Sequence, residues 1–200
     1  MKRLRLLALV PVALVLAACS NTHSVGDATH GSMGSDITSS GHDMMHGDHS
    51  NAADVMFAQM MIPHHEQAVE MSTLAETRAS DPQIVALAAQ IGSAQQPEIE
   101  QMTGWLQAWG SSVMDQDQAM AMGHGMQGIL SDVQLAELKA ATGSEFDRLF
   151  ATCMIAHHEG AIEMAKQVEN SANSEVAALA NQIITSQTVE IEQLKAFLAN

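Results

Sequence analysis

The two halves of the chain repeat each other, and this repeat constrains the fold more than any other feature. The segment MMIPHHEQAVEM at 60–71 returns as CMIAHHEGAIEM at 153–164. A second pair of similar segments follows, QIVALAAQIGSAQQPEIEQMTGWL at 83–106 and EVAALANQIITSQTVEIEQLKAFL at 175–198. Each repeat therefore consists of two segments joined by a short polar turn, and a duplication of this kind sets the architecture of a chain.

Both repeats carry the hydrophobic periodicity of long helices, without the sustained alternation that is typical of strands. We expect helices at 54–78, 82–109, 145–170 and 175–199, and a short helix from 131 to 141. Their ends are indicated by Asp81 with Pro82, Ser131 with Gln134, Gly143, Ser144 and Ser174. The pattern predicts an all-α fold, a ferritin-like four-helix bundle made of two repeated hairpins with a long central connector. The bundle domain is expected to span 54–199, with repeats at about 54–109 and 147–199.

The first 19 residues have the layout of a secretory signal peptide. MKRLRLLALVPVALVLAAC begins with basic residues, continues with a short apolar run and ends on small residues before Cys19. The LAAC ending resembles a bacterial lipoprotein box, in which Cys19 is lipidated and becomes the mature N-terminus. The apolar run is shorter than the roughly 20 residues that cross a membrane. We therefore expect an exported protein, anchored to the membrane by lipid on Cys19 and facing outside the cytoplasm.

The charge and the cysteine content limit which partners the chain can bind and what can stabilise its fold. The chain has 23 acidic and 8 basic residues, a formal net charge of −15. Such a surface argues against nucleic acid and favours cations. Without Cys19 only Cys153 remains, so no intramolecular disulfide can form and stability must come from the core or from a metal. The sequence indicates no particular protein partner.

Two segments outside the long helices are rich in histidine and methionine. Residues 20–53 lack apolar periodicity and are expected to form a disordered tether, either a plain spacer or a collector of copper(I) or silver. The connector at 110–130 is either a plain loop or a chelating segment. The secondary metal candidates in these two segments are His42, Met44, Met45, His46, His49, Met120, Met122, His124 and Met126.

Helical phase turns both histidine pairs toward the core. At 100° per residue, His64 and His65 straddle the apolar face of the first helix, whereas its glutamates fall on the opposite face. The pair His157 and His158 occupies the same positions in the second repeat. We expect all four imidazoles to point inward.

A glutamate on each partner helix lies level with a histidine pair. Glu98 lies on the apolar stripe of the second helix, and Asp81 in the turn stands midway between His64 and Glu98. Glu190 holds the same position relative to His157. A carboxylate on a buried stripe needs a partner. The two groups are either metal ligands or a hydrogen-bonded pair that fixes the register of the helices without metal.

The duplicated HHE segment, the EIEQM and EIEQL segments at 98–102 and 190–194, and the leader together resemble the bacterial domain of unknown function 305 family. The resemblance covers about 54–199 and implies a ferritin-like helical fold. Some members of that family have been linked to binding copper or silver outside the cytoplasm. The resemblance implies metal ligation by His64, His65, Met71, His157, His158 and Met164. Met60, Met61, Met102 and Met154 are further sulfur candidates, although Cys153 and Leu194 replace Met60 and Met102 in the second repeat.

Three functions remain open from the sequence. The first is an extracytoplasmic lipoprotein that sequesters or passes on a copper ion, with silver, zinc or iron as alternatives. The second is a ferritin-like oxidase with a metal pair held by the histidines, Glu98 and Glu190, although the Glu-x-x-His pairs of di-iron carboxylate bundles are missing. The third is a structural or interaction lipoprotein that binds no metal. The soft sulfur content favours the first of these functions.

Overall fold

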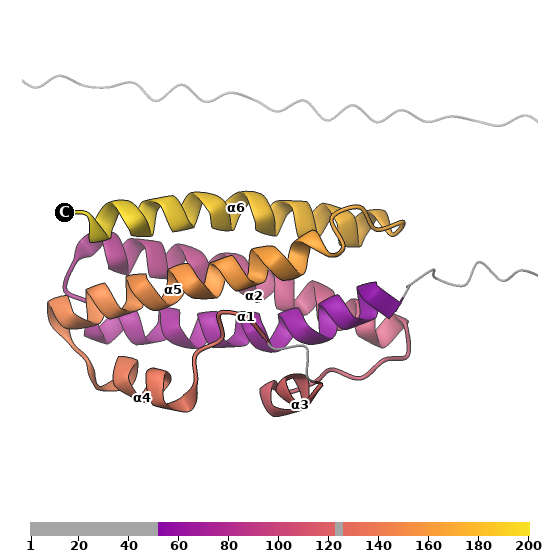
Figure 1. Ribbon diagram of the computed structural model, residues 1–200, viewed down its shortest axis with the longest axis horizontal. Helices are drawn as coiled ribbons and strands as arrows, with labels where there is room; N and C mark the ends of the chain where they lie inside the picture. Colours follow the sequence, from indigo (N-terminus) through magenta and orange to yellow (C-terminus); the bar gives the residue numbers. More distant parts are fainter. Residues whose placement is uncertain (1–51, 123–125) are drawn as a thin grey trace, which may run out of the picture. The chain divides into compact units, whose positions relative to one another are not determined.

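The chain is seen here in a computed structural model that describes residues 52–122 and 126–200. Within these ranges there are six helices and no strand, which confirms the all-α prediction (Figure 1). The leader, the tether with its histidines and methionines, and His124 lie outside the described residues. The helices are α1 (Ala52–Arg78), α2 (Pro82–Ala108), α3 (Gln116–Ala121), α4 (Asp132–Ala140), α5 (Gly143–Lys166) and α6 (Ser174–Leu198).

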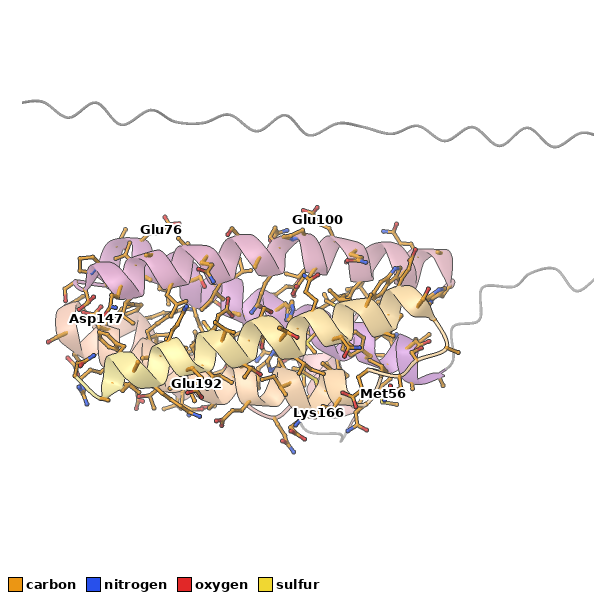
Figure 2. All side chains as sticks on the ribbon, turned by 90° about the horizontal axis from the view of Figure 1, so that it is seen from above. Met56, Glu76, Glu100, Asp147, Lys166 and Glu192 are labelled. Carbon is orange, nitrogen blue, oxygen red and sulfur yellow. The ribbon has the colours of Figure 1, made fainter. Side chains whose placement is uncertain are left out.

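The four long helices form two antiparallel hairpins, as the repeat predicts. Helix α1 packs along α2 and α5 packs along α6, and contacts between α1 and α5 join the hairpins. The short helices α3 and α4 lie on the connector along one flank of the bundle (Figure 1). Exposed carboxylates such as Glu76, Glu100 and Glu192 point away from the helices (Figure 2). No helix in the described ranges is long and apolar enough to cross a membrane. The ferritin-like form of the connection stays a prediction.

Side-chain hydrogen bonds cap the N-termini of α2, α3, α4 and α6, with two corrections to the sequence prediction. Asp81 accepts a hydrogen bond from the Gln83 amide, and Ser131 forms the expected capping box with Gln134. The N-cap of α5 is Thr142 rather than Ser144, because Gly143 adopts a positive φ of 64° and already opens the helix instead of ending the previous one. The N-cap of α6 is Asn173 rather than Ser174. Helix α3 lies within the segment at 110–130 that was expected to be a connector, and it starts with its own capping box.

Two equivalent aspartates tie each hairpin to the turn of the other. Asp147 near the start of α5 accepts hydrogen bonds from the Ser80 amide, the Ser80 hydroxyl and the Asp81 amide. Asp54 near the start of α1 accepts one from the Ser171 hydroxyl at 2.8 Å. Because both aspartates are buried, these bonds fix the ends of the two hairpins relative to each other.

The core consists of two apolar clusters separated by a polar layer. One cluster gathers the C-terminal part of α1, the N-terminal parts of α2 and α5, and Leu130 and Leu138 from the connector. The other gathers the N-terminal parts of α1 and α6 with the C-terminal parts of α2 and α5. Neither cluster contains the buried histidines, glutamines and glutamates that lie between them along the four helices. Each long helix therefore carries its buried polar groups near its middle.

The connector docks tightly across the bundle beside this layer. Gln67 of α1 binds both backbone groups of Leu130, with distances of 2.7 Å from the Leu130 amide and 3.0 Å to its carbonyl. On α5, the Gln127 carbonyl lies where a side chain at Gly160 would be, since an added Cβ there would meet that oxygen at 1.8 Å. At Gly128, which has a φ of 82°, an added Cβ would meet the Ala156 carbonyl oxygen at 2.2 Å. The path of the connector thus depends on glycine at two contact points.

We expect Gly160→Ala to destabilise the protein by about 1–3 kcal/mol, because the added methyl group must push the connector off α5. Gly104→Ala is the matched control, since Gly104 lies within the C-terminal part of α2 with nothing within 4 Å of the added Cβ. That substitution should raise the free energy of unfolding by roughly 0.5–1 kcal/mol. Urea unfolding followed by circular dichroism measures both values. Equal effects of the two substitutions would show that the connector is not packed against α5 in solution.

Candidate metal centre

Four histidines meet in the polar layer, two from α1 and two from α5. His64, His65, His157 and His158 have no exposed surface. The layer is completed by the nearly buried side chains of Gln95 and Glu98 from α2 and of Gln187 and Glu190 from α6. All four imidazoles point inward, as helical phase predicts.

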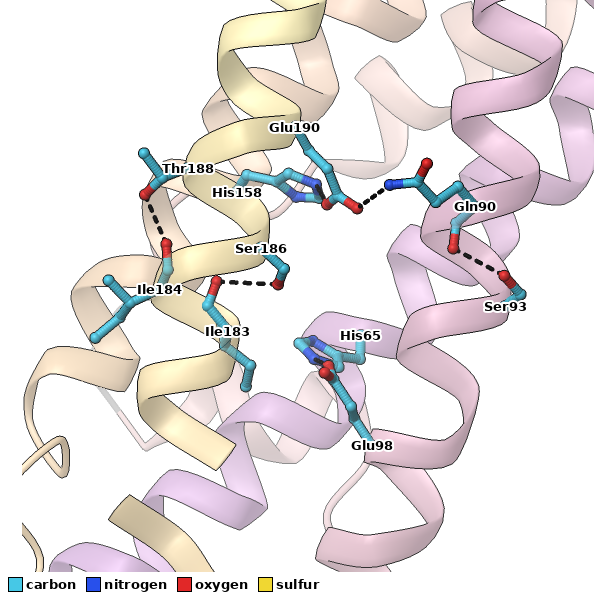
Figure 3. Close-up of polar contacts among 10 residues, drawn as sticks. All are labelled: His65, Gln90, Ser93, Glu98, His158, Ile183, Ile184, Ser186, Thr188 and Glu190. Atoms are coloured by element: carbon cyan, nitrogen blue, oxygen red, sulfur yellow. Dashed lines mark hydrogen bonds and ion pairs between the residues drawn. The ribbon is translucent and has the colours of Figure 1, made fainter. Parts of the chain in front are cut away.

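In each histidine pair, one imidazole hydrogen-bonds to a glutamate on the partner helix. Nε2 of His65 lies 2.8 Å from Oε2 of Glu98, and Nε2 of His158 lies 2.8 Å from Oε2 of Glu190 (Figure 3). Because a carboxylate oxygen accepts, Nε2–H donates in both contacts. Both carboxylates are supported from the opposite hairpin, where Gln182 donates to Glu98 at 3.0 Å and Gln90 donates to Glu190 at 3.4 Å.

The other member of each pair lies at the centre of the bundle. The ring centroids of His64 and His157 are 3.8 Å apart. Nε2 of His64 lies 3.2 Å from the Gln127 carbonyl of the connector and must donate to it. Both ring nitrogens of His157 lack a hydrogen-bond partner. The two histidines are equivalent in the repeat, but the connector accepts a hydrogen bond only from His64.

Five imidazole nitrogens in the layer are buried without a hydrogen-bond partner. They are Nδ1 of His64, Nδ1 of His65, Nδ1 of His158, and both ring nitrogens of His157. The amide of Gln95 and the carbonyl oxygen of Gln187 are also unsatisfied. Buried polar atoms in folded proteins nearly always have a partner, and each orphan costs about 1–3 kcal/mol. The layer therefore contains buried nitrogen and oxygen atoms that are available to bind a ligand.

The two central histidines are held in the neutral form. Burial lowers the pKa of His64 from 6.5 to about 3, helped by the positive charge that His65 would carry and opposed by the Gln127 carbonyl. Burial likewise lowers the pKa of His157 well below 6.5, with the charges that His64, His158 and His65 would carry adding to the effect and the nearby His64 backbone opposing it. A neutral His64 that donates from Nε2 has its lone pair on Nδ1, which has no partner. Such a nitrogen can coordinate a metal without first losing a proton.

The methionine candidates are distributed around the layer rather than within it. Met61 and Met102 are fully buried in one apolar cluster, and Met71 and Met154 are fully buried in the other. Met60 and Met102 belong to different clusters. Met60 and Met126 instead form a small separate cluster against which Met164 packs, whereas Met120 and Met122 are exposed.

Among residues 52–122 and 126–200, no group of three or more histidine, cysteine, aspartate or glutamate side chains is arranged to hold a metal ion. The two buried glutamates already bind histidines, and the side chain of Cys153 belongs to an apolar cluster. Burial raises the pKa of the Cys153 thiol, and Glu137 adds to the shift. In this geometry the available donors are pairs of imidazole nitrogens.

The contacts that sequence reasoning missed all depend on the connector or on the neighbouring hairpin. The Gln127 carbonyl at His64 is a backbone group, which no side-chain pattern reveals. Gln90 and Gln182 reach the glutamates across the interface between hairpins. The only available sequence signal was the pair of glycines, Gly128 and Gly160, that permits the close approach of the connector.

The family model described as Domain of unknown function (DUF305) matches residues 54–198. The chain is also similar to a solved structure described as a putative secreted protein DUF305 from Streptomyces coelicolor. That likeness has 33% sequence identity and a TM-score of 0.68, and covers 74% of this chain and 92% of the other. A DUF305 fragment from Deinococcus radiodurans is 29% identical with a TM-score of 0.66, covering 75% of this chain and 97% of the fragment. Among the curated proteins, none matches the chain.

Structures of the protein CopM are similar to this chain as well. The form described as Cu(I)-bound is 34% identical with a TM-score of 0.62, and the match covers 74% of this chain and 96% of CopM. CopM has also been solved in forms described as Cu(II)-bound and Ag-bound. These descriptions concern CopM.

We expect substitution by leucine to have opposite effects on stability at His157 and His158, which are adjacent and equally buried. His157→Leu should raise the free energy of unfolding of the metal-free protein by about 1–3 kcal/mol, because it removes two unsatisfied nitrogens. His158→Leu should lower that free energy by a similar amount, because Glu190 loses its 2.8 Å partner. Urea unfolding in the presence of a chelator measures both changes. Destabilisation by both variants would mean that the nitrogens of His157 have partners in solution.

The metal-free protein should also lose stability as the pH falls from about 6.5 toward 3. In this window the unfolded chain protonates His64 and His157 while the folded protein keeps them neutral, so unfolding takes up protons. The loss is at most roughly 1.4 kcal/mol per pH unit for each histidine. Unfolding at several pH values should therefore show a steeper decline for the wild type than for His64→Leu/His157→Leu. Parallel curves for the two proteins would contradict the neutral state of the pair.

Proposed function

This chain belongs to the DUF305 family, and on that premise we propose that its buried histidine layer binds a soft monovalent metal ion, copper(I) or silver(I). The observation that supports the proposal most directly is the set of unpartnered imidazole nitrogens at the centre of the bundle. The CopM structures solved with copper and silver support the same chemistry in a related protein. The ion is cargo that the protein holds and releases.

The glutamate contacts have the form of the outer shell of a metal site. Histidines that bind metal through one ring nitrogen usually donate the other N–H to a carboxylate, which fixes the tautomer and the ring orientation. Here Glu98 and Glu190 hold Nε2 of His65 and His158, so Nδ1 of each ring is the nitrogen left for a metal. We assign Nδ1 of His65 and His158 as ligands, with His64 and His157 beside them as the other two donors.

Dryness and ligand number favour a monovalent ion in this layer. A divalent ion brings two charges into an interior without exposed surface, which requires charged ligands or many of them to offset desolvation. The described donors are imidazole nitrogens, which carry no negative charge, and the nearby carboxylates already bind histidines. Copper(I) and silver(I) carry one charge and bind imidazole nitrogen.

We further propose that the protein works outside the cytoplasm as a lipid-anchored carrier or store. The leader ending on Cys19 supports export and lipidation, and the similar Streptomyces coelicolor protein is described as secreted. The acidic composition would concentrate cations near the bundle. The oxidase alternative gains no specific support from the layer, because both buried glutamates already hydrogen-bond to histidines.

The test is an anaerobic titration of the purified full chain with copper(I) in competition with a coloured chelator. His64→Leu/His157→Leu should weaken the tightest binding about 100-fold or more, because two of the four donors are gone. Glu98→Gln/Glu190→Gln should weaken it by roughly 10–100-fold, because the histidines lose their orienting carboxylates. Circular dichroism checks that the variants stay helical.

A matched control is Gln95→Leu/Gln187→Leu, which changes buried polar side chains of the same layer and leaves every imidazole in place. Binding by this control should stay within a few-fold of the wild type. If the folded histidine variant bound copper(I) as tightly and in the same ratio as the wild type, the layer would not be the site. The tether or the connector would then be responsible.

A further inference from the structure

A second group of sulfur atoms surrounds a pocket near one end of the bundle. The pocket has a volume of about 510 Å³ and is partly open to solvent. Met56 and Met60 of α1 and Met164 of α5 line it, together with Gln127 of the connector. Met126 belongs to the same small cluster as Met60. Helices α1 and α5 thus line the pocket with three methionines, and the connector adds Met126 to the neighbouring cluster. Met56 and Asp147 lie near opposite ends of the bundle (Figure 2).

We infer that this methionine pocket, lined by Met56, Met60 and Met164 with Met126 in the adjoining cluster, is a second binding site for a soft monovalent cation, separate from the histidine layer. Thioether sulfur is neutral and polarisable, so it binds copper(I) and silver(I) in preference to hard divalent ions. It carries no proton at any ordinary pH and needs no deprotonation before it binds. The one carboxylate that lines the pocket, Glu163, is paired with the exposed Lys166 at 2.6 Å.

The two halves of the chain differ at this position in a way that ordinary packing does not require. The residues equivalent to Met56 and Met60 in the second repeat are Leu149 and Cys153, and both contact a closed apolar cluster. There α4 and Leu130 contribute to the covering of the helices. Methionine that serves as a gap filler closes the space around it. In the first half, the methionines instead surround a cavity and Met56 is 37% exposed.

The methionine pocket also adjoins the histidine layer through one residue. Gln127 lines the pocket, and its carbonyl accepts the hydrogen bond from Nε2 of His64 at 3.2 Å. A cation bound by the thioethers would therefore be separated from His64 by this backbone segment. The position suits a holding site next to the buried layer. Binding at the pocket does not require that the layer bind metal.

The inference can be tested with silver(I) and with methionine methyl groups as reporters. We titrate the full chain, labelled with ¹³C at the methionine ε-methyl groups, and follow the signals by NMR. The signals of Met56, Met60, Met126 and Met164, assigned by single substitutions to leucine, should shift together and saturate. In Met60→Leu/Met126→Leu/Met164→Leu, the silver stoichiometry should fall by one ion while the protein stays folded, because methionine and leucine have similar volumes.

The matched control is Met61→Leu/Met102→Leu/Met154→Leu, in which three fully buried methionines of the apolar clusters are replaced. Its stoichiometry should equal that of the wild type. In His64→Leu/His157→Leu the shifts in the pocket should persist, so failure of the histidine site and failure of the pocket are separate results. The inference would be overturned if these four signals did not shift at silver saturation, or if the pocket variant kept the wild-type stoichiometry.

Discussion

The structure depends on two buried hydrogen bonds, from His65 to Glu98 and from His158 to Glu190, each 2.8 Å long. They lie between two apolar clusters that would otherwise form one continuous core. A shift of one helix along its partner would separate an imidazole from its carboxylate and leave both groups buried without a partner. Apolar side chains tolerate such a shift far better than a polar pair does. The polar layer therefore sets the register of both hairpins, and the apolar clusters supply the stability around it.

The same layer is more polar than its structural task requires. Fixing the register needs one imidazole and one carboxylate in each hairpin, yet each hairpin buries two imidazoles and an unsatisfied glutamine. Replacing such groups with apolar side chains of similar size is generally neutral or stabilising. The extra histidines, His64 and His157, thus lower the stability of the metal-free protein. Unpaired buried polar groups of this kind are characteristic of sites that bind a ligand. The unpaired imidazole nitrogens therefore favour a binding function over a purely structural role for the layer.

Much of this arrangement can be predicted from the sequence because it follows from helical geometry. The repeat predicts the two hairpins, and helical phase predicts that the histidines point inward. Because Asp81 lies midway between His64 and Glu98, these two residues are predicted to lie at the same height in the hairpin. The choice between adjacent histidines is not predictable in this way. His64 and His65 lie on either side of the apolar face, and the packing of four helices decides that only His65 meets Glu98. The methionine pocket is equally hidden, because it depends on the path of a connector with no periodic pattern.

The connector makes the two halves of a duplicated bundle chemically different. By the repeat alone, His64 and His157 would have the same surroundings. The connector crosses one side of the bundle, where Gln67 and Gly160 hold it, and brings the Gln127 carbonyl to His64. An ion that binds His157 therefore displaces no hydrogen bond, whereas Nε2 of His64 binds an ion only after it leaves Gln127. Coordination at Nδ1 leaves the Gln127 contact intact, so the connector selects which nitrogen of His64 is available. The asymmetry thus arises from one backbone carbonyl, whose position depends on a difference between the two histidine motifs, since Gln67 and Gly160 are equivalent in the repeat.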